Sequence, residues 1–373
     1  MFTLASLDHA VLGAPMAGGP STPALAAAVS NAGGLGFLAA GYKTPEALET
    51  EIAATRELTG GGGGRPFGVN LFVPDIANTA GPLPTGDGMP GNGTAGNLAA
   101  ALAYRGELAR EYPAETLPLP DPADTDGWDA KLELVDRLQV PVVSFTFGLP
   151  SAAVLAALSD AGTAVAVTVT TVAEAELAAA AGARMLCLQG PDAGGHRGSL
   201  DAAAEPATQP LPELVQAVRS RLGTGVELIA AGGITTYGRA RELRAAGADA
   251  VQIGTALLLS PEAGTAAVHR AALQDPQFTA TALTRAFSGR TARGLANRFM
   301  AAHPGAPAAY PLVNQVTKRL RAQAAAAGDP HGTSLWAGTG YREARPEPAA
   351  RTVTRISGNG SSAAIRRQLS GGC

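Results

Sequence analysis

Short apolar runs recur along the chain, and stretches with helical spacing separate most of them. The runs span residues 10–14, 34–40, 66–73, 140–147, 163–170, 184–189, 227–231 and 250–253. The clearest amphipathic stretches span residues 151–161, 172–181, 211–222 and 237–246. Nearly continuous apolar strands that alternate with helices predict a parallel sheet covered on both faces. Eight such repeats favour an α/β fold, a closed (β/α)8 TIM barrel over residues 1–262, with a doubly wound open sheet as the alternative.

Two regions interrupt this rhythm. Residues 74–127 follow the third strand, are rich in Pro, Gly, Asp and Asn, and contain one predicted helix at 96–111. Long loops in compact domains tend to be functional, and we expect this insertion to act as a partial lid. Residues 263–345 lack the barrel pattern and predict an appended helical region over the active-site side, with helices at 276–283 and 310–327. The polar residues 346–373 predict a disordered tail.

Composition excludes several classes of function. Hydrophobic residues make up 46% of the 373 and charged residues 16%, and the net charge is −3. The absence of a basic stripe argues against a nucleic-acid partner. No signal peptide or membrane span is recognised, so we expect a cytoplasmic protein without a membrane partner. Two cysteines cannot form a disulfide framework, and Cys187 is interpreted as a small buried hydrophobe.

Candidate binding residues cluster where the predicted strands end, which is where TIM barrels carry their active sites. Met16 follows the first strand within a run of small residues suited to a flat aromatic ring. Asn70 lies inside the third apolar strand, so its amide either bonds neighbouring backbone or reaches a polar ligand. The last two strands end in Gly232-Gly233 and in Gln252-Ile253-Gly254-Thr255. Exposed backbone N–H groups at these two ends predict a phosphate site.

The most informative segment is Gln189-Gly190-Pro191-Asp192-Ala193-Gly194-Gly195-His196-Arg197-Gly198. Paired glycines allow a ligand to approach the backbone closely, and a histidine beside them can move a proton or donate a hydrogen bond. His196 is therefore the candidate catalytic residue. The remaining histidines are expected at the surface or in loops: His9, His269, His303 and His331. No His-x-x-x-His pair or Cys/His cluster is present, so no metal site is expected.

These residues resemble the class I nitronate monooxygenases, flavin enzymes once called 2-nitropropane dioxygenases. The resemblance runs through residues 14–19, 68–72, 142–148, 189–198, 231–234, 252–255, 288–290, 310–314 and 335–338. It implies a non-covalent FMN with His196 as the active-site histidine. The positions implied to hold the flavin or its phosphate are Met16, Asn70, Gln189, Gly194, Gly233, Gln252, Gly254 and Thr255. Tyr310 and Lys318 match the segment that lines the substrate pocket.

The resemblance further implies oxidative denitrification of a propionate 3-nitronate-like anion with O2, giving a carbonyl compound and nitrite or nitrate. Lys318 and Arg197 are candidates to neutralise the carboxylate of such a substrate, or are simply solvated charges. Alternatives on the same scaffold are an FMN-dependent 2-enoyl-acyl-carrier-protein reductase, an NADH:quinone reductase and a flavin-binding protein without turnover. A monomer and a homodimer are both compatible with the sequence.

Overall fold

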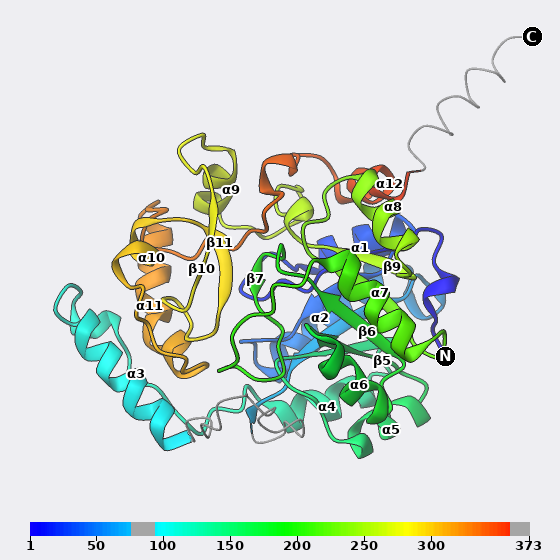
Figure 1. Cartoon of the computed structure of the whole chain (residues 1–373), viewed down its shortest axis with the longest axis horizontal. Coiled ribbons are helices and arrows are strands. Elements are labelled where there is room, and N and C mark those ends of the chain that lie inside the picture. The colour runs from blue at the N-terminus through cyan, green and yellow to red at the C-terminus, as the bar shows by residue number, and fades with distance from the viewer. Residues whose placement is uncertain (76–93, 359–373) are drawn as a thin grey trace, which may run out of the picture.

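The computed structural model describes residues 1–75 and 94–358 of the chain, and its centre is a barrel of parallel strands (Figure 1). The strands follow the order β1-β9-β8-β6-β5-β4-β3-β2 around the sheet. Their bounds are β1 Val11–Gly13, β2 Gly36–Ala39, β3 Phe67–Phe72, β4 Val142–Thr146, β5 Ala164–Val169, β6 Met185–Gln189, β8 Glu227–Ala231 and β9 Ala250–Ile253. The N–H of Gly13 donates to the carbonyl of Leu35 at 2.9 Å, and the N–H of Leu35 donates to Val11 at 3.2 Å. These bonds join β1 to the start of β2, so the sheet closes and the open-sheet alternative is wrong.

Alternation along each strand divides the apolar residues between two layers. On β6, Met185 and Cys187 face a cluster inside the barrel, whereas Leu186 and Leu188 pack into the layer beneath the helices. A strand buried on both faces has no polar side, which explains the nearly continuous apolar runs. Cys187 is 4% exposed, and burial raises the pKa of its thiol to about 12, as expected of a buried hydrophobe.

Helices cover the outside of the barrel, and local sequence signals set their starts. The hydroxyl of Thr22 accepts the N–H of Leu25 at 3.0 Å, and Pro23 occupies the first turn of α1. Thr44, Ser151, Thr171 and Thr236 cap four further helices in the same way. The helices that follow the first seven strands around the barrel are α1 Pro23–Asn31, α2 Pro45–Leu58, α4 Trp128–Arg137, α5 Ala152–Asp160, α6 Val172–Ala180, α7 Leu211–Leu222 and α8 Tyr237–Ala245.

The last described helix, α12 (Ala349–Ser357), corrects the prediction of a disordered tail from residue 346. It lies beside α1 and α8, the position that the helix after β9 occupies in a complete barrel (Figure 1). Ala349, Val353 and Ile356 are fully buried against the barrel helices. The segment is polar on average, so its apolar residues at helical spacing were not recognised as one face of a helix. Residues 359–373 lie outside the described part of the chain.

The region between β9 and α12 is partly a sheet, not only helices. It contains α9 Ala267–Gln274, α10 Arg298–Ala302 and α11 Leu312–Ala326, and the last of these matches the helix predicted at 310–327. The helix predicted at 276–283 is wrong, because β10 (Thr281–Thr284) pairs there with β11 (Ala292–Leu295). This pairing with a distant partner overrides local helix propensity. A third strand, β7 (Gly195–His196), joins β11 on its other side.

Helix α3 (Thr94–Leu108) matches the helix predicted inside the insertion after β3. It lies beside α11 (Figure 1), and its buried residues Ala101, Tyr104 and Leu108 share an apolar cluster with the region after β9. The insertion and the appended region therefore pack together. Residues 76–93 of the insertion lie outside the described part, so its role as a lid stays a prediction.

No helix in the described residues is long and apolar enough to span a membrane.

Candidate active site

The loop after β6 is held by its own side chains. Gln189 donates from Nε2 to the carbonyl of His196 at 3.0 Å and accepts the N–H of Gly198 at 2.8 Å. The guanidinium of Arg197 donates to the carbonyls of Gly190 and Gln189. Arg197 is 3% exposed, so it is not a solvated charge, and two of its three guanidinium nitrogens donate to its own loop. Gln189 and Arg197 thus fix the loop that presents His196.

His196 is half-buried, and one of its ring nitrogens already has a partner. Nε2 lies 2.8 Å from the hydroxyl oxygen of Ser288, in the turn between β10 and β11. Three aromatic rings surround the imidazole, with centroids 5.7 Å away for Phe147, 5.8 Å for Tyr310 and 5.3 Å for Trp336. No described residue bonds Nδ1, which leaves that nitrogen available to a ligand.

The surroundings keep His196 neutral. Burial lowers the pKa of His196 to about 3, and the positive charges of Arg290 and Arg321 act in the same direction. A neutral imidazole carries one N–H and one bare nitrogen. At neutral pH the ring can therefore donate one hydrogen bond and accept another, and it does not supply a fixed positive charge.

A cavity of about 410 Å³ opens beside these rings. Tyr310, at the start of α11, lines it and shares a 3.1 Å hydroxyl contact with Tyr42. Burial raises the pKa of Tyr310 well above its usual value, so the phenol stays protonated. Lys318, one of the predicted substrate residues, lies on the cavity wall with an exposed side chain. The structure therefore brings Tyr310 and Lys318 to one cavity next to His196.

Backbone strain concentrates at this cavity. Four non-glycine residues among those described have left-handed backbone: Tyr42 (φ 68°), Asp126 (φ 56°), Gln139 (φ 48°) and Phe147 (φ 78°). Three of them line the cavity, all except Gln139. Such conformations cost about 1–3 kcal/mol each and tend to occur at functional sites. This clustering points to the cavity as the binding site.

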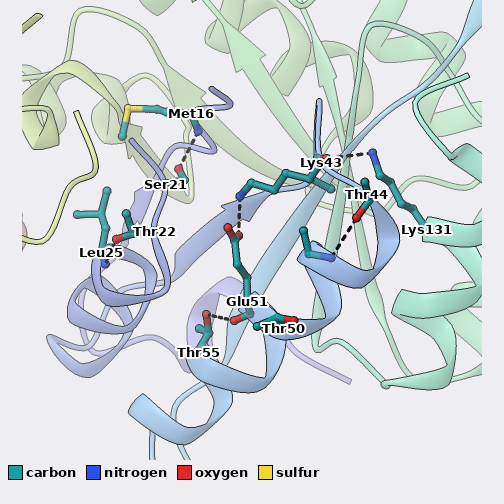
Figure 2. A network of polar contacts seen from close by, with 12 residues as sticks. Met16, Ser21, Thr22, Leu25, Lys43, Thr44, Thr50, Glu51, Thr55 and Lys131 are labelled. Carbon is teal, nitrogen blue, oxygen red and sulfur yellow. Dashed lines mark hydrogen bonds and ion pairs between the residues drawn. The ribbon is translucent and has the colours of Figure 1, made fainter. Parts of the chain in front are cut away.

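A buried ion pair supports the strained residues. Lys131 is 2% exposed, and its ammonium lies 2.8 Å from a carboxylate oxygen of Asp126 and 3.0 Å from the carbonyl of Ala40. The other carboxylate oxygen of Asp126 accepts the N–H of Tyr42 at 2.9 Å. Figure 2 shows Lys131 reaching the end of β2 next to the neighbouring Lys43–Glu51 pair. Lys131 and Asp126 therefore position Tyr42 at the cavity.

The glycine-bearing ends of β8 and β9 lie beside the loop that follows β6. Gly233 has φ 66°, and a Cβ there would lie 2.8 Å from the Cβ of Asp192. A Cβ on Gly254 would lie 3.3 Å from the Cβ of Ala14 and 3.6 Å from the sulfur of Met16. Met16 is therefore placed beside the end of β9. Its N–H donates to the hydroxyl of Ser21 at 2.8 Å, which fixes the turn after β1 (Figure 2).

These strand ends fit an anionic cofactor. A short 3-10 helix starts at Thr255, and the first N–H groups of a helix have no partner within it. The hydroxyl of Thr255 accepts the N–H of Gly338 at 2.9 Å and keeps its own proton for another acceptor. Gly195 has φ 74°, and no atom lies within 4 Å of the place where a Cβ would point. Open space beside this backbone suits a flat ring, and the N–H groups near Thr255 suit a phosphate.

Other predicted positions have mainly internal partners. The amide nitrogen of Asn70 donates to the carbonyl and hydroxyl of Ser144, at 3.1 and 2.9 Å, and to Thr146 at 3.0 Å. The neighbouring strand therefore satisfies this amide nitrogen. Gly194 is tightly packed, because a Cβ there would lie 2.4 Å from the nitrogen of Gly338. Gln252 is half-buried at the end of β9.

Two of the histidines expected at the surface or in loops are buried: His269, in α9, is 8% exposed, and His303, in the loop after α10, is 9% exposed. His303 packs against the rings of Phe299 and Tyr104 within the cluster that joins the insertion to the region after β9. His269 lies in α9, and burial lowers its pKa to about 4. In the described part of the chain, no group of His, Cys, Asp and Glu residues could hold a metal ion.

Sequence reasoning did not single out three residues of the site: Tyr42, Ser288 and Arg290. Tyr42 reaches the cavity through a left-handed backbone conformation that the sequence does not reveal. Ser288 and Arg290 belong to the Ser-Gly-Arg segment, whose glycine has φ 78° and turns the chain between two strands. The resemblance had included residues 288–290, but without giving either residue a role.

The fold and the site together define a TIM barrel whose histidine loop lies beside the glycine-bearing ends of β8 and β9. A family model described as "Nitronate monooxygenase" matches residues 2–357. The chain belongs to the nitronate monooxygenase family, which consists of flavin enzymes.

Individual relatives agree with this assignment. A "Probable nitronate monooxygenase" of Staphylococcus aureus (strain MSSA476) is 34% identical over 363 residues, which cover 94% of each chain. A solved structure of a nitroalkane oxidase from Streptomyces ansochromogenes is 44% identical with a TM-score of 0.85, over 98% of this chain and 99% of that one. The structure of FabK from Thermotoga maritima shares the fold, with a TM-score of 0.70 at 24% identity and coverage of 97% and 96%.

Proposed function

We propose that this protein is an FMN-dependent nitronate monooxygenase that oxidises alkyl nitronates with O2. The observation that carries the proposal is a neutral His196 with one unoccupied ring nitrogen, at an aromatic cavity beside a cradle for an anionic cofactor. Family membership and the nitroalkane oxidase neighbour support it. One O2 per nitronate balances a carbonyl compound plus nitrate, and half an O2 balances a carbonyl compound plus nitrite.

FMN would be held by Gly233, Gly254 and Thr255 at its phosphate, with its ring near Met16 and Gly195. When bound, FMN supplies the electron transfer that couples the nitronate to O2. The protein positions the groups that contact the substrate and sets the charge around them. Gln189 and Arg197 keep the loop rigid, so that His196 is preorganised before substrate binds.

His196 has two possible tasks at the atom Nδ1. If the bound species is already a nitronate, Nδ1–H donates a hydrogen bond to one of its oxygens. If a neutral nitroalkane binds, a bare Nδ1 takes the proton from the carbon beside the nitro group, and the negative charge of the nitronate so formed stabilises the imidazolium. The hydroxyl of Ser288 at Nε2 accommodates both, because it can accept from or donate to that nitrogen.

The test is steady-state oxygen uptake with ethyl nitronate, alongside measurement of nitrite and nitrate, in purified flavin-loaded protein. We expect turnover in the wild type and a loss of about 10²–10⁴-fold in kcat/KM for neutral nitroethane in His196→Asn, since general-base assistance has that magnitude. His331→Asn is the matched control, because the His331 ring packs against Phe278 and not against the rings that surround His196. No oxygen uptake by wild-type protein with any alkyl nitronate would overturn the proposal.

A further inference from the structure

The hydroxyl groups of two tyrosines meet at the cavity wall. Tyr42 lies in the loop between β2 and α2 and Tyr310 lies just before α11, yet their hydroxyl oxygens are 3.1 Å apart. Burial raises the pKa of both phenols, so each keeps its proton at neutral pH. One hydrogen bond between the two hydroxyls uses one of their two protons. The pair therefore has one O–H left to donate to a ligand.

Ring contacts distinguish the two tyrosines. The ring of Tyr310 lies 5.8 Å from the imidazole of His196, centroid to centroid. The ring of Tyr42 packs edge-on against Phe72 at 5.4 Å, and Phe72 packs against Phe147 at 4.5 Å. Of the two phenols, Tyr310 is the one that contacts the imidazole, so a ligand at His196 is expected to meet the hydroxyl of Tyr310.

Tyr42 is held in a strained conformation by contacts outside the cavity. Its backbone is left-handed, with φ 68°, and its N–H donates to a carboxylate oxygen of Asp126 at 2.9 Å. The other oxygen of Asp126 lies 2.8 Å from the buried ammonium of Lys131. A strained tyrosine persists only where its surroundings over-determine it, and such strain tends to occur at functional sites. The ion pair therefore fixes where the hydroxyl of Tyr42 lies.

We propose that Tyr42 is a positioning residue that acts through Tyr310: its hydroxyl donates to the oxygen of Tyr310, so that Tyr310 donates its own proton to an oxygen of the bound nitronate. This inference rests on the proposed function and adds a residue to it. The ligand sets the order, because Tyr310 has one proton and can accept from Tyr42 while it donates. A hydroxyl that accepts a hydrogen bond is also a stronger donor, by about 10–30%.

The test is a double-mutant cycle, read by oxygen uptake with ethyl nitronate in flavin-loaded protein. We expect Tyr310→Phe to lower kcat/KM about 10- to 100-fold, as for a lost hydrogen bond to a charged group. Tyr42→Phe should lower it about 3- to 10-fold, as for a lost hydrogen bond between neutral groups. The double variant should match Tyr310→Phe within about twofold, because Tyr42 has no effect once its partner hydroxyl is gone.

Tyr104→Phe is the matched control. It removes the hydroxyl of a buried tyrosine that donates to the carbonyl of Ala286 at 3.0 Å, within the cluster that joins the insertion to the region after β9. The loss of stability in urea titrations should resemble that of Tyr42→Phe, whereas kcat/KM should stay within about twofold of the wild type. A purely structural role for Tyr42 would make the two variants alike in both measurements.

Losses that multiply in the double variant would show that Tyr42 acts independently of Tyr310 and would overturn the inference, as would wild-type kcat/KM in Tyr42→Phe. If Tyr42→Phe does not fold, Lys131→Met takes its place, since the side chain of Asp126 is 27% exposed and stays hydrated without its partner. Lys131→Met should lower kcat/KM in the wild type but not in Tyr310→Phe, and equal losses in both would overturn the inference. A wild type that oxidises no alkyl nitronate refutes the proposed function, and the inference with it.

Discussion

Replacing Ser288 by Ala tests whether the site works through a positioned neutral imidazole. The hydroxyl lies 2.8 Å from Nε2 of His196 and 3.2 Å from the carbonyl of Arg290. Ser288 is 1% exposed, so water cannot readily replace the lost hydroxyl. An unsatisfied buried partner costs about 1–3 kcal/mol, which corresponds to about 5- to 150-fold in kcat/KM.

The assay is oxygen uptake with ethyl nitronate between pH 5 and pH 9. Because burial, with Arg290 and Arg321, lowers the pKa of His196 to about 3, the ring is neutral over this whole range. We therefore expect the same loss at every pH in Ser288→Ala, and recovery to within about threefold in Ser288→Thr, which keeps a hydroxyl. An Ala variant with wild-type kcat/KM would refute the positioning role. A wild-type profile that titrates near 6.5 would refute the neutral imidazole.

Three further predictions concern packing and pH. Ile356→Ala should lower the free energy of unfolding by about 2–5 kcal/mol in urea titrations, because Ile356 is fully buried. Arg351→Ala, at an exposed position of the same helix, should change it by less than about 0.5 kcal/mol. Equal effects of the two substitutions would contradict the packing of α12 against the barrel. His269 has a pKa of about 4 when folded, below its unfolded value of about 6.5, so the unfolded state binds more protons between these values and stability falls as the pH is lowered. His269→Gln should reduce the slope of stability against pH by about 1 kcal/mol per unit near pH 5, and an unchanged slope would exclude this contribution. Gly194→Ala places a Cβ 2.4 Å from the nitrogen of Gly338, so it should purify with less flavin per protein by absorbance; full flavin content would show that the loop tolerates the shift.

The barrel could be predicted because its strands are buried on both faces and its helices carry clear caps. Such signals can be recognised within a short window of the sequence. Helix α12 was missed because its apolar residues are few and lie among arginines and threonines. Strand β10 was missed because its pairing with β11 is a tertiary contact with no local pattern.

The site was predictable only in part. Glycine pairs and a histidine identified the loop, and the resemblance added Tyr310 and Lys318. The sequence could not show that Arg197 turns back onto its own loop, or that Arg290 lies against Phe147 near the cavity. The positions of both arginines follow from the pairing of β7 with β11. These strands are about a hundred residues apart in the sequence, so no local pattern shows their register.

We expect this protein to oxidise nitronates and not to reduce substrates with NADH. The most direct test follows the flavin absorbance of purified protein after anaerobic mixing with propionate 3-nitronate and, separately, with NADH. We expect a rapid spectral change with the nitronate that reverses on admitting O2, and no bleaching by NADH. Rapid bleaching by NADH together with no response to the nitronate would refute the proposed function and favour an NADH-dependent reductase.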